Sequence, residues 1–320
     1  MDTVLDRPAP PADVASVSLA DFAHDRDAFA QALGHSFERY GFAVVSNHGI
    51  SSELIARAEA AAKALFALPE DRKLGYRPTG GAGQRGYTAF GVETAKDAKA
   101  VDLKEFWHVG RELPAGHRYE DRMPPNIWPQ ELTDFRAVML DLFAAFEATG
   151  ARLLEAIARY LKLTPDFFAD TVAEGNSVLR LLHYPPVAGD GPSIRAGAHE
   201  DINTITLLLG AEEAGLEILD RDGRWLSVTP KEGELAVNVG DMLQRLTNGR
   251  LRSTTHRVAN PVSARRGHAR YSMPFFLHFR PDYRIETLPG CVDAVHPDRY
   301  PEPITAHDYL IERLREIKLL

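Results

Sequence analysis

The chain has 320 residues, of which 44% are hydrophobic and 26% charged, as in an ordinary globular protein of one large or two small domains. Its net charge of −8 argues against a surface that binds nucleic acid or an anionic membrane. The single cysteine, Cys291, excludes an internal disulfide and a thiolate cluster, so any metal must be bound by nitrogen and oxygen.

The N-terminal half is predicted to be largely helical. Apolar residues recur at helical spacing over 25–41 and again over 53–68, where Ser51 or Ser52 can cap the helix, and a strand is expected at 42–50 between them. The start of the chain resembles no signal peptide, and no apolar run reaches the roughly 18 residues that span a bilayer. We therefore expect a monomeric cytoplasmic protein.

Residues 75–125 are rich in glycine, proline and aromatic side chains and show no steady period. Long irregular segments in compact proteins are usually functional or disordered, and the interspersed aromatic residues favour an ordered functional loop. A long amphipathic helix is predicted to follow at 133–161.

The C-terminal half consists of short β-like runs separated by turns: 177–184, 204–209, 216–220, 224–230, 234–240, 253–258 and 270–279. Asp222-Gly223 and Asn248-Gly249 have the composition of hairpin turns. Seven such strands predict a mainly β fold, a sandwich or jelly roll with a helical N-terminal region and a last helix at 305–320. We expect residues 1–170 and 171–320 to form one integrated unit.

The segment AHEDIN, residues 198–203, places an imidazole and two carboxylates before an apolar strand. In an extended chain His199 and Asp201 share one face, while Glu200 points to the other. His199 and Asp201 are therefore candidate metal ligands, and the third ligand must come from elsewhere in the chain.

His256, in a predicted strand 57 residues further on, is the candidate third ligand. Two imidazoles and one carboxylate form the facial triad of non-haem Fe(II) oxygenases, which leaves three positions on the metal open. A second His-x-Asp pair, His296 and Asp298, lies in a proline-flanked segment that is typical of a surface loop.

Arg270 and Ser272 lie two residues apart in a predicted strand, so both side chains point to the same face. A guanidinium with a neighbouring hydroxyl can bind a carboxylate. Tyr184 can add a hydrogen bond through its hydroxyl.

The segments YGFAVVSNHGI, LLHYPP, AHEDINTITLLL, NGRLRSTTHRV and ARYSMPFF resemble the isopenicillin N synthase-like branch of the Fe(II)- and 2-oxoglutarate-dependent oxygenases. The resemblance extends from about residue 41 to 279, in the same order and at similar spacing. It implies a distorted double-stranded β-helix, which is a cupin-like jelly roll. It also implies that His199, Asp201 and His256 bind Fe(II).

The same resemblance implies that Arg270, Ser272 and Tyr184 bind 2-oxoglutarate, with O2 as the oxidant and ascorbate as a candidate reductant. The expected activity is hydroxylation or desaturation of a small molecule, with release of succinate and CO2. Leu182 stands where plant members often carry an asparagine, and isopenicillin N synthase, which uses no 2-oxoglutarate, has an aliphatic residue there. An oxidase like that enzyme or aminocyclopropanecarboxylate oxidase is therefore the alternative, and a non-enzymatic jelly-roll binding protein is a more distant one.

The sequence does not identify the substrate, because members of this family select it with irregular loops near the site. The candidate substrate residues are Arg85, Tyr87, Phe275 and Phe276. Among them, Arg85 could bind an anionic substrate.

Overall fold

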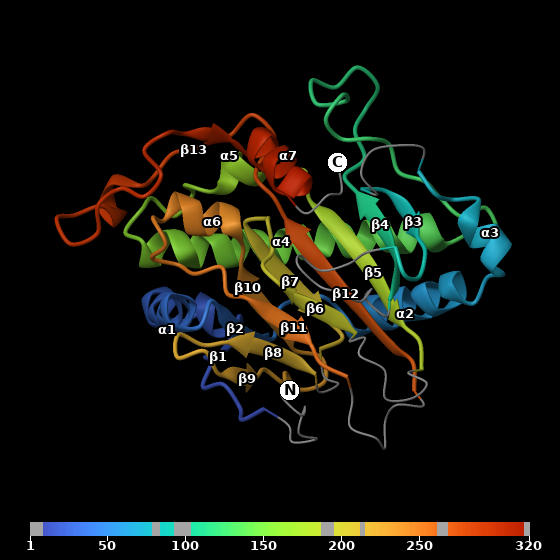
Figure 1. The fold of residues 1–320 in the computed structure, drawn as a ribbon, viewed down its shortest axis with the longest axis horizontal. Helices are drawn as coiled ribbons and strands as arrows, with labels where there is room; N and C mark the ends of the chain where they lie inside the picture. The colour runs from blue at the N-terminus through green and yellow to red at the C-terminus, as the bar shows by residue number, and fades with distance from the viewer. Residues whose placement is uncertain are drawn as a thin grey trace.

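The computed structural model describes residues 9–78, 84–92, 104–186, 195–211, 215–260 and 268–316. Its centre is an eight-stranded sheet that faces a four-stranded sheet (Figure 1). The larger sheet runs in the order β1 (Ser16–Ser18), β2 (Phe42–Ser46), β10 (Leu235–Val239), β7 (Ile205–Leu209), β12 (Arg270–Leu277), β5 (Val178–Tyr184), β4 (Glu105–Gly110) and β3 (Gly86–Thr88). The smaller sheet contains β6 (Ala196–His199), β11 (His256–Val258), β8 (Leu216–Leu219) and β9 (Trp225–Ser227).

Apolar side chains from both sheets meet between them. Phe42 and Ala236 of the larger sheet belong to the same buried cluster as Leu216 and Ile218 of the smaller one. All strand pairs within these two sheets are antiparallel except β1 with β2. Two facing antiparallel sheets of this kind form a double-stranded β-helix, so the predicted jelly roll is confirmed.

Helices cover the outer face of the larger sheet, the face turned away from the smaller sheet. The longest is α4 (Phe135–Tyr160), and α1 (Arg26–Arg39) and α2 (Ser52–Phe66) pack beside it. Ser51 caps α2 by accepting a hydrogen bond from the backbone N–H of Leu54, as the sequence predicts. The apolar face of α4 packs on alternate residues of the strands, so this side of the sheet forms the main hydrophobic core.

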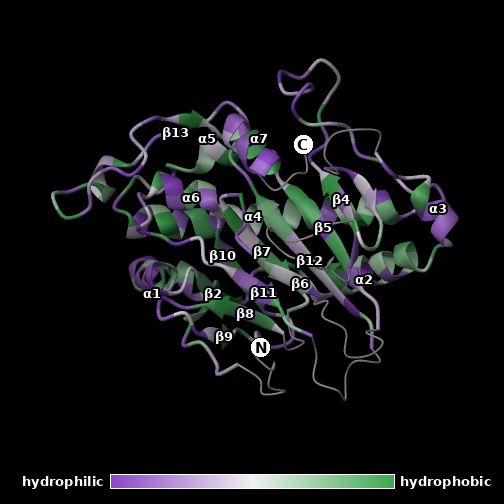
Figure 2. Cartoon of the chain, in the orientation of Figure 1, coloured by the Kyte–Doolittle hydropathy of each residue, from purple (hydrophilic) through white to green (hydrophobic). Residues whose placement is uncertain are grey.

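The remaining elements are short or peripheral: α3 (Glu70–Leu74), α5 (Ala169–Val172), α6 (Asp241–Leu246), α7 (Ala306–Glu316), the 3-10 turns Asp21–Ala23 and Pro289–Cys291, and the strand pair β13 (Arg284–Ile285) and β14 (Ile304–Thr305). Colouring by hydropathy shows the contrast between the hydrophobic central strands and the hydrophilic residues of α3 and α7 (Figure 2). None of the helices described is both long enough and apolar enough to cross a membrane.

The N-terminal half contributes more strands than the sequence predicts. β2 was expected, but β1, β3 and β4 were not, and β4 lies in the segment interpreted as a loop. β4 lies between β3 and β5 in the sheet, and all six of its residues are buried. Its side chains therefore do not alternate between apolar and polar. A strand that is covered on both faces lacks the period-two pattern by which strands are recognised. Part of that segment, 79–83 and 93–103, lies outside the described residues.

The structure differs from two local expectations of the sequence analysis. Asn248 and Gly249 have positive φ angles as expected, but they follow α6 and end that helix instead of joining two strands. The segment 198–202 is not one continuous strand, because β6 ends at His199 and Asp201 lies in the connection to β7. The Asp222-Gly223 turn does join the paired strands β8 and β9.

The register of the larger sheet places certain residues of its strands in one row on its inner face, the face towards the smaller sheet. Adjacent pairs in this row are Phe42 with Asn238, Asn238 with Thr206, Thr206 with Phe276, Phe276 with Val178, and Val178 with Gly110. Directly paired residues of neighbouring strands point to the same face. We call this set the inner row.

Candidate metal centre

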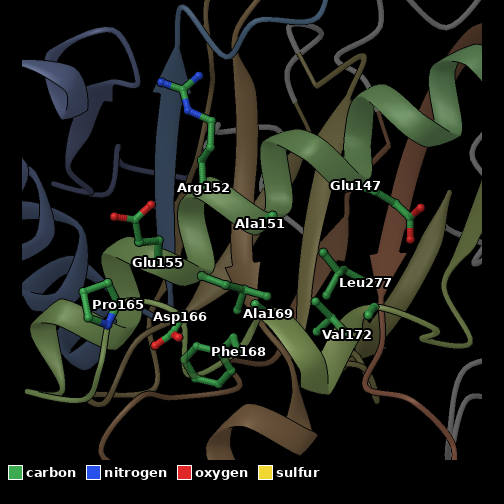
Figure 3. A pocket seen from close by; sticks show the side chains of 12 residues that line it. Glu147, Ala151, Arg152, Glu155, Pro165, Asp166, Phe168, Ala169, Val172 and Leu277 are labelled. Atoms are coloured by element: carbon green, nitrogen blue, oxygen red, sulfur yellow. The ribbon is translucent and has the colours of Figure 1, made fainter.

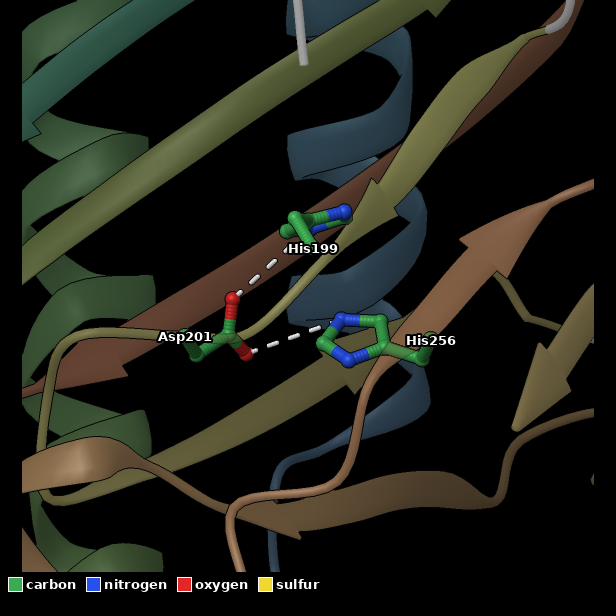
Figure 4. Close-up of side chains that lie close together, drawn as sticks. All are labelled: His199, Asp201 and His256. Atoms are coloured by element: carbon green, nitrogen blue, oxygen red, sulfur yellow. Dashed lines mark ion pairs between the residues drawn. The ribbon is translucent and has the colours of Figure 1, made fainter. Parts of the chain in front are cut away.

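Three potential metal ligands converge where the smaller sheet meets the inner row (Figure 4). His199 is the last residue of β6 and His256 the first residue of β11, and the antiparallel register pairs them directly. Asp201 follows two residues after His199 and reaches the same point from the connection to β7. The pairing of β6 with β11 therefore brings together residues that are 57 positions apart in the sequence.

The donor atoms of these side chains all lie within 4.8 Å of one another. His199 Nε2 lies 3.9 Å from Asp201 Oδ1, and His256 Nε2 lies 3.9 Å from Asp201 Oδ2. The centroids of the two imidazole rings are 4.4 Å apart. Two Nε2 atoms and a carboxylate oxygen on one side of a common point form a facial set of three ligands.

Backbone carbonyls fix the orientation of both imidazoles. His199 Nδ1 lies 2.7 Å from the carbonyl oxygen of Gly197, and His256 Nδ1 lies 3.0 Å from that of Thr254. An Nδ1–H that donates to a carbonyl leaves the Nε2 lone pair free for a metal. Burial lowers the pKa of His199 to about 4, and the charge of His256 lowers it too, so this ring is neutral at physiological pH.

Two neighbouring strands hold the carboxylate of Asp201. Its Oδ2 accepts hydrogen bonds from Thr206 Oγ1 at 2.6 Å and from Asn238 Nδ2 at 2.8 Å. Burial acts to raise the pKa of Asp201, but His256, His199 and these two donors outweigh it and lower the pKa. The group is therefore an anion whose orientation is fixed before any metal binds.

The neighbouring Glu200 does not belong to this set. Its side chain is exposed and accepts a hydrogen bond from Thr255 Oγ1 at 2.8 Å. His296 is also exposed, and it contacts Asp293 at 3.1 Å in a surface loop. Both positions agree with the sequence analysis.

Arg270 and Ser272 lie on the inner face of β12, with exposed fractions of 2% and 3%. Arg270 Nη1 donates to Ser272 Oγ at 3.4 Å, and Nη2 donates to the carbonyl of Gly210 at 3.0 Å. Arg270 Nε has no hydrogen-bond partner in the described part of the chain. The Tyr184 ring lies 5.2 Å from Arg270 Cζ, and Leu182 pairs with Ser272, so the three residues expected at the cosubstrate lie together.

The candidate substrate residues lie on different faces of the sheet. Phe276 is on the inner row, where the guanidinium of Arg180 lies 5.2 Å from its ring. Phe275 is on the outer face, fully buried between Phe143 and Phe146 of α4, with ring centroids 4.9 and 5.1 Å away. The prediction of Phe275 as a substrate residue is wrong, because its side chain belongs to the core between helix and sheet.

Tyr87 is also on the outer face. It pairs with Trp107, and its hydroxyl donates to Glu105 Oε2 at 2.5 Å inside a buried cluster that includes Lys73. The prediction of Tyr87 as a substrate residue is therefore wrong as well. Arg85, two residues before it, turns back to the inner face because Gly86 has a φ of +67°, which interrupts the alternation of the strand.

Two further residues support Asp201 and were not predicted from the sequence. Thr206 and Asn238 are single polar residues within the apolar strands β7 and β10, and both are at most 3% exposed. A buried polar side chain in the middle of an apolar strand needs a partner, so this pattern could have indicated them.

A groove of about 600 Å³ lies at a different place, between α4 and α5 (Figure 3). Its lining includes Glu147, Arg152 and Phe168, together with Leu277 of the outer face. The groove is on the opposite side of the sheet from His199, Asp201 and His256, so it takes no part in the metal centre.

A jelly roll with two histidines and one carboxylate on a common face defines the class of non-haem Fe(II) oxygenases. Comparison with known proteins identifies the family within this class. Residues 11–131 match the model of the N-terminal region of "non-haem dioxygenase in morphine synthesis", and residues 175–279 match the "2OG-Fe(II) oxygenase superfamily". The chain belongs to the 2OG-Fe(II) oxygenase superfamily and is a 2-oxoglutarate-dependent Fe(II) dioxygenase.

Individual relatives agree with this assignment. The "2-oxoglutarate-Fe(II) type oxidoreductase hxnY" of Emericella nidulans is 36% identical, over 87% of this chain and 81% of the relative. The "Proline hydroxylase buaE" of Petromyces alliaceus is 35% identical, over 94% and 98%.

Two solved structures are similar over nearly their whole length. A 2OG-Fe(II) oxygenase family protein from Caulobacter crescentus has 57% identity and a TM-score of 0.91, with 96% of this chain and 99% of that one covered. A full-length Neurospora crassa protein in complex with alpha-KG, which is 2-oxoglutarate, has 30% identity and a TM-score of 0.86, with 97% and 99% covered. These findings favour 2-oxoglutarate chemistry over the oxidase and the non-enzymatic alternatives.

Proposed function

We propose that this dioxygenase hydroxylates or desaturates a small organic molecule at an Fe(II) ion bound by His199, Asp201 and His256. The observation that carries the proposal is the convergence of three donor atoms within 4.8 Å, each fixed by a hydrogen bond to its side chain. Two neutral imidazoles and one carboxylate suit a divalent iron, which keeps a charge of +1 and three open positions. When bound, iron supplies the chemistry that couples conversion of 2-oxoglutarate and O2 to succinate and CO2 with oxidation of a substrate C–H bond.

Arg270, Ser272 and Tyr184 bind the distal carboxylate of 2-oxoglutarate in this proposal. The Nε of Arg270, which has no hydrogen-bond partner among the described residues, supports it, because a buried guanidinium is unfavourable without an anion. The Ser272 hydroxyl can turn to donate to the same carboxylate. The cosubstrate then lies along the inner face of β12, between Arg270 and the metal ligands.

Apolar side chains of the inner face lie beside the proposed metal ligands, where they would limit the access of water. The ring of Phe42 meets His256 edge-on, with centroids 5.3 Å apart. Phe276 lies on the same row and is the apolar residue that we assign to the substrate. Exclusion of water strengthens the electrostatic interactions inside such a site and prevents side reactions.

A small-molecule substrate is supported by relatives whose names state what they act on or bind. One is a proline hydroxylase, and a Neurospora crassa structure that is 30% identical contains thymine together with alpha-KG.

The large exposed hydrophobic residues that are described fall in three separate stretches of the sequence: Leu74, then Phe90 and Val92, then Val292 and Val295. From the sequence, we also propose a monomeric cytoplasmic protein in which segments 1–170 and 171–320 form one catalytic unit.

Anaerobic titration tests the proposal. Addition of 2-oxoglutarate to the Fe(II)-loaded protein should produce a weak visible charge-transfer band that depends on both components. Admission of air should then release succinate in proportion to the 2-oxoglutarate consumed. Asp201→Ala is the matched negative control, because it removes one ligand and leaves both imidazoles.

Iron binding without any spectral response to 2-oxoglutarate would contradict the proposal and would favour an oxidase that uses no 2-oxoglutarate. Absence of iron binding in the wild-type protein would refute the assignment of the three ligands.

A further inference from the structure

Arg85 is a second fully buried arginine on the inner face of the large sheet. Its exposed fraction is 1%, and Nη1 donates to the carbonyl of Gln84 at 2.7 Å. Nε and Nη2 have no hydrogen-bond partner in the described part of the chain. Burial lowers the pKa of Arg85 to about 10, which still leaves the side chain cationic at neutral pH.

The two Arg85 nitrogens that lack a partner within the described ranges form one edge of the guanidinium. Nε–H and Nη2–H point in parallel directions, and this pair of donors matches the two oxygens of a carboxylate. A buried cation with two unsatisfied donors is unfavourable unless an anion binds there. Structural arginines are normally paired with an acid or with carbonyls, so this one has the character of a binding residue.

The position of Arg85 relates it to the metal centre. A Cβ atom on Gly110 would lie 1.9 Å from Arg85 Cζ, so the guanidinium occupies the space that a side chain at Gly110 would fill. Gly110 is the last residue of the inner row, and Thr206, which supports Asp201, lies three strands away on the same row. Neighbouring strands are about 4.8 Å apart, so Gly110 and Thr206 are separated by about 14 Å.

The buried His278 lies two residues after Phe276 and is close enough to both Arg85 and Asp201 to be affected by their charges. Burial lowers the pKa of His278 to about 4, the nearby charge of Asp201 acts to raise it, and that of Arg85 acts to lower it. His278 therefore lies within electrostatic range of both residues. Arg270 lies at the start of β12, six residues before Phe276, so the two buried arginines mark different ends of the inner face.

We propose that the paired Nε–H and Nη2–H of Arg85 bind a carboxylate of the substrate, whose apolar body lies over Phe276 towards His199, Asp201 and His256. The inference rests on the proposed function, because it assumes that Arg270 is occupied by 2-oxoglutarate. It defines the substrate class as a small carboxylic acid that is oxidised at a carbon remote from its acid group.

Calorimetric titration under anaerobic conditions tests the inference on the full chain loaded with Mn(II) and saturating 2-oxoglutarate. The probes are four acids and their primary amides: benzoate, cyclohexanecarboxylate, indole-3-acetate and L-proline. At least one acid should bind the wild type roughly 30-fold more tightly than its amide, the order expected for a charge-assisted pair of hydrogen bonds. Arg85→Gln should remove this preference and leave the affinity for 2-oxoglutarate within about twofold.

Arg85→Lys keeps the charge but loses the parallel donors, so it should also lose most of the preference for the acid over its amide. If Arg85→Gln does not fold, Arg85→Lys decides the result. Arg284→Gln, in an exposed position on β13, is the matched control and should bind every probe as the wild type does. Equal binding of acids and amides by the wild type, or a preference that survives both Arg85 variants, overturns the inference. Failure of the Mn(II)-loaded wild type to bind 2-oxoglutarate refutes the proposed function instead, and is seen before any probe is added.

Discussion

Thr206→Val removes one of the two hydrogen bonds that orient the metal-binding carboxylate. Valine has nearly the volume of threonine, so the packing of β7 stays intact. The change deletes the hydroxyl that donates to Asp201 Oδ2 at 2.6 Å and that also accepts from Asn203 Nδ2 at 3.1 Å, a side chain that keeps its bond to the carbonyl of Ile205. A hydrogen bond to a charged group contributes about 1.5–3 kcal/mol, and loss of residues that orient metal ligands weakens metal binding by about 10- to 100-fold. We therefore expect the affinity for Fe(II) to fall within that range.

The same variant has a defined effect on the pH dependence of metal binding. Thr206 is one of the donors that lower the pKa of Asp201, so its loss raises that pKa. Metal binds only the deprotonated carboxylate, and the acid limb of the binding profile should therefore move to higher pH. Competition with a chelator, measured anaerobically between about pH 3 and 7, a range that includes the ordinary pKa of an aspartate, gives both the affinity for the metal and the position of the acid limb.

Thr204→Val is the matched control. The Thr204 hydroxyl is buried two residues earlier and has no hydrogen-bond partner in the described part of the chain, so its removal should leave metal affinity unchanged. If Thr206→Val binds Fe(II) as tightly as the wild type, or both variants lose the same amount, the hydrogen bond does not orient Asp201 and the reasoning is refuted.

Three further substitutions, two of them with a control variant, test other parts of the structure. Asp201→Ala should abolish succinate release while Glu200→Ala, at an exposed position outside the site, should retain most of it; equal losses would contradict the assignment of the ligand. Arg270→Ala should weaken 2-oxoglutarate by about 3 kcal/mol, or roughly 100-fold, in anaerobic titrations, with Arg284→Ala unchanged. Phe275→Ala should lower the free energy of unfolding, measured in urea, by about 3–5 kcal/mol, because it leaves a cavity against α4. The affinity for Fe(II) should stay within about twofold of the wild type. A selective loss of metal binding would instead place Phe275 at the site.

The parts of the site that follow from spacing along one strand were predictable, and the parts that depend on register between strands were not. Arg270 and Ser272 share a face because they lie two residues apart in β12, and the sequence shows that directly. Asn238 supports Asp201 only because β10 pairs with β7 in one particular register. Such a pairing joins segments about 30 residues apart, and no local pattern encodes it.

The wrong substrate candidates have the same physical origin. Phe275 and Phe276 are adjacent and equally apolar, so composition cannot decide which one faces the metal. Packing against α4 decides it, because the outer face of the sheet must bury large side chains against that helix. Tyr87 was predicted from its position in an irregular segment, but β3 is a strand, and its pairing with β4 turns Tyr87 to the outer face.

The inner row also explains how one rigid element can relate metal binding to substrate binding. Thr206 and Asn238 orient Asp201 at one part of the row, while Gly110 leaves room for Arg85 at its end. Groups supported by strands of one sheet keep their separation better than groups on loops, so the distance between the metal and a bound carboxylate is set by three strand spacings. A change of residue type at position 85 should then alter which polar group is bound without moving the metal. The substrate carbon that lies at the iron would be selected by its distance from the carboxylate bound at Arg85. The strands of the sheet set that distance.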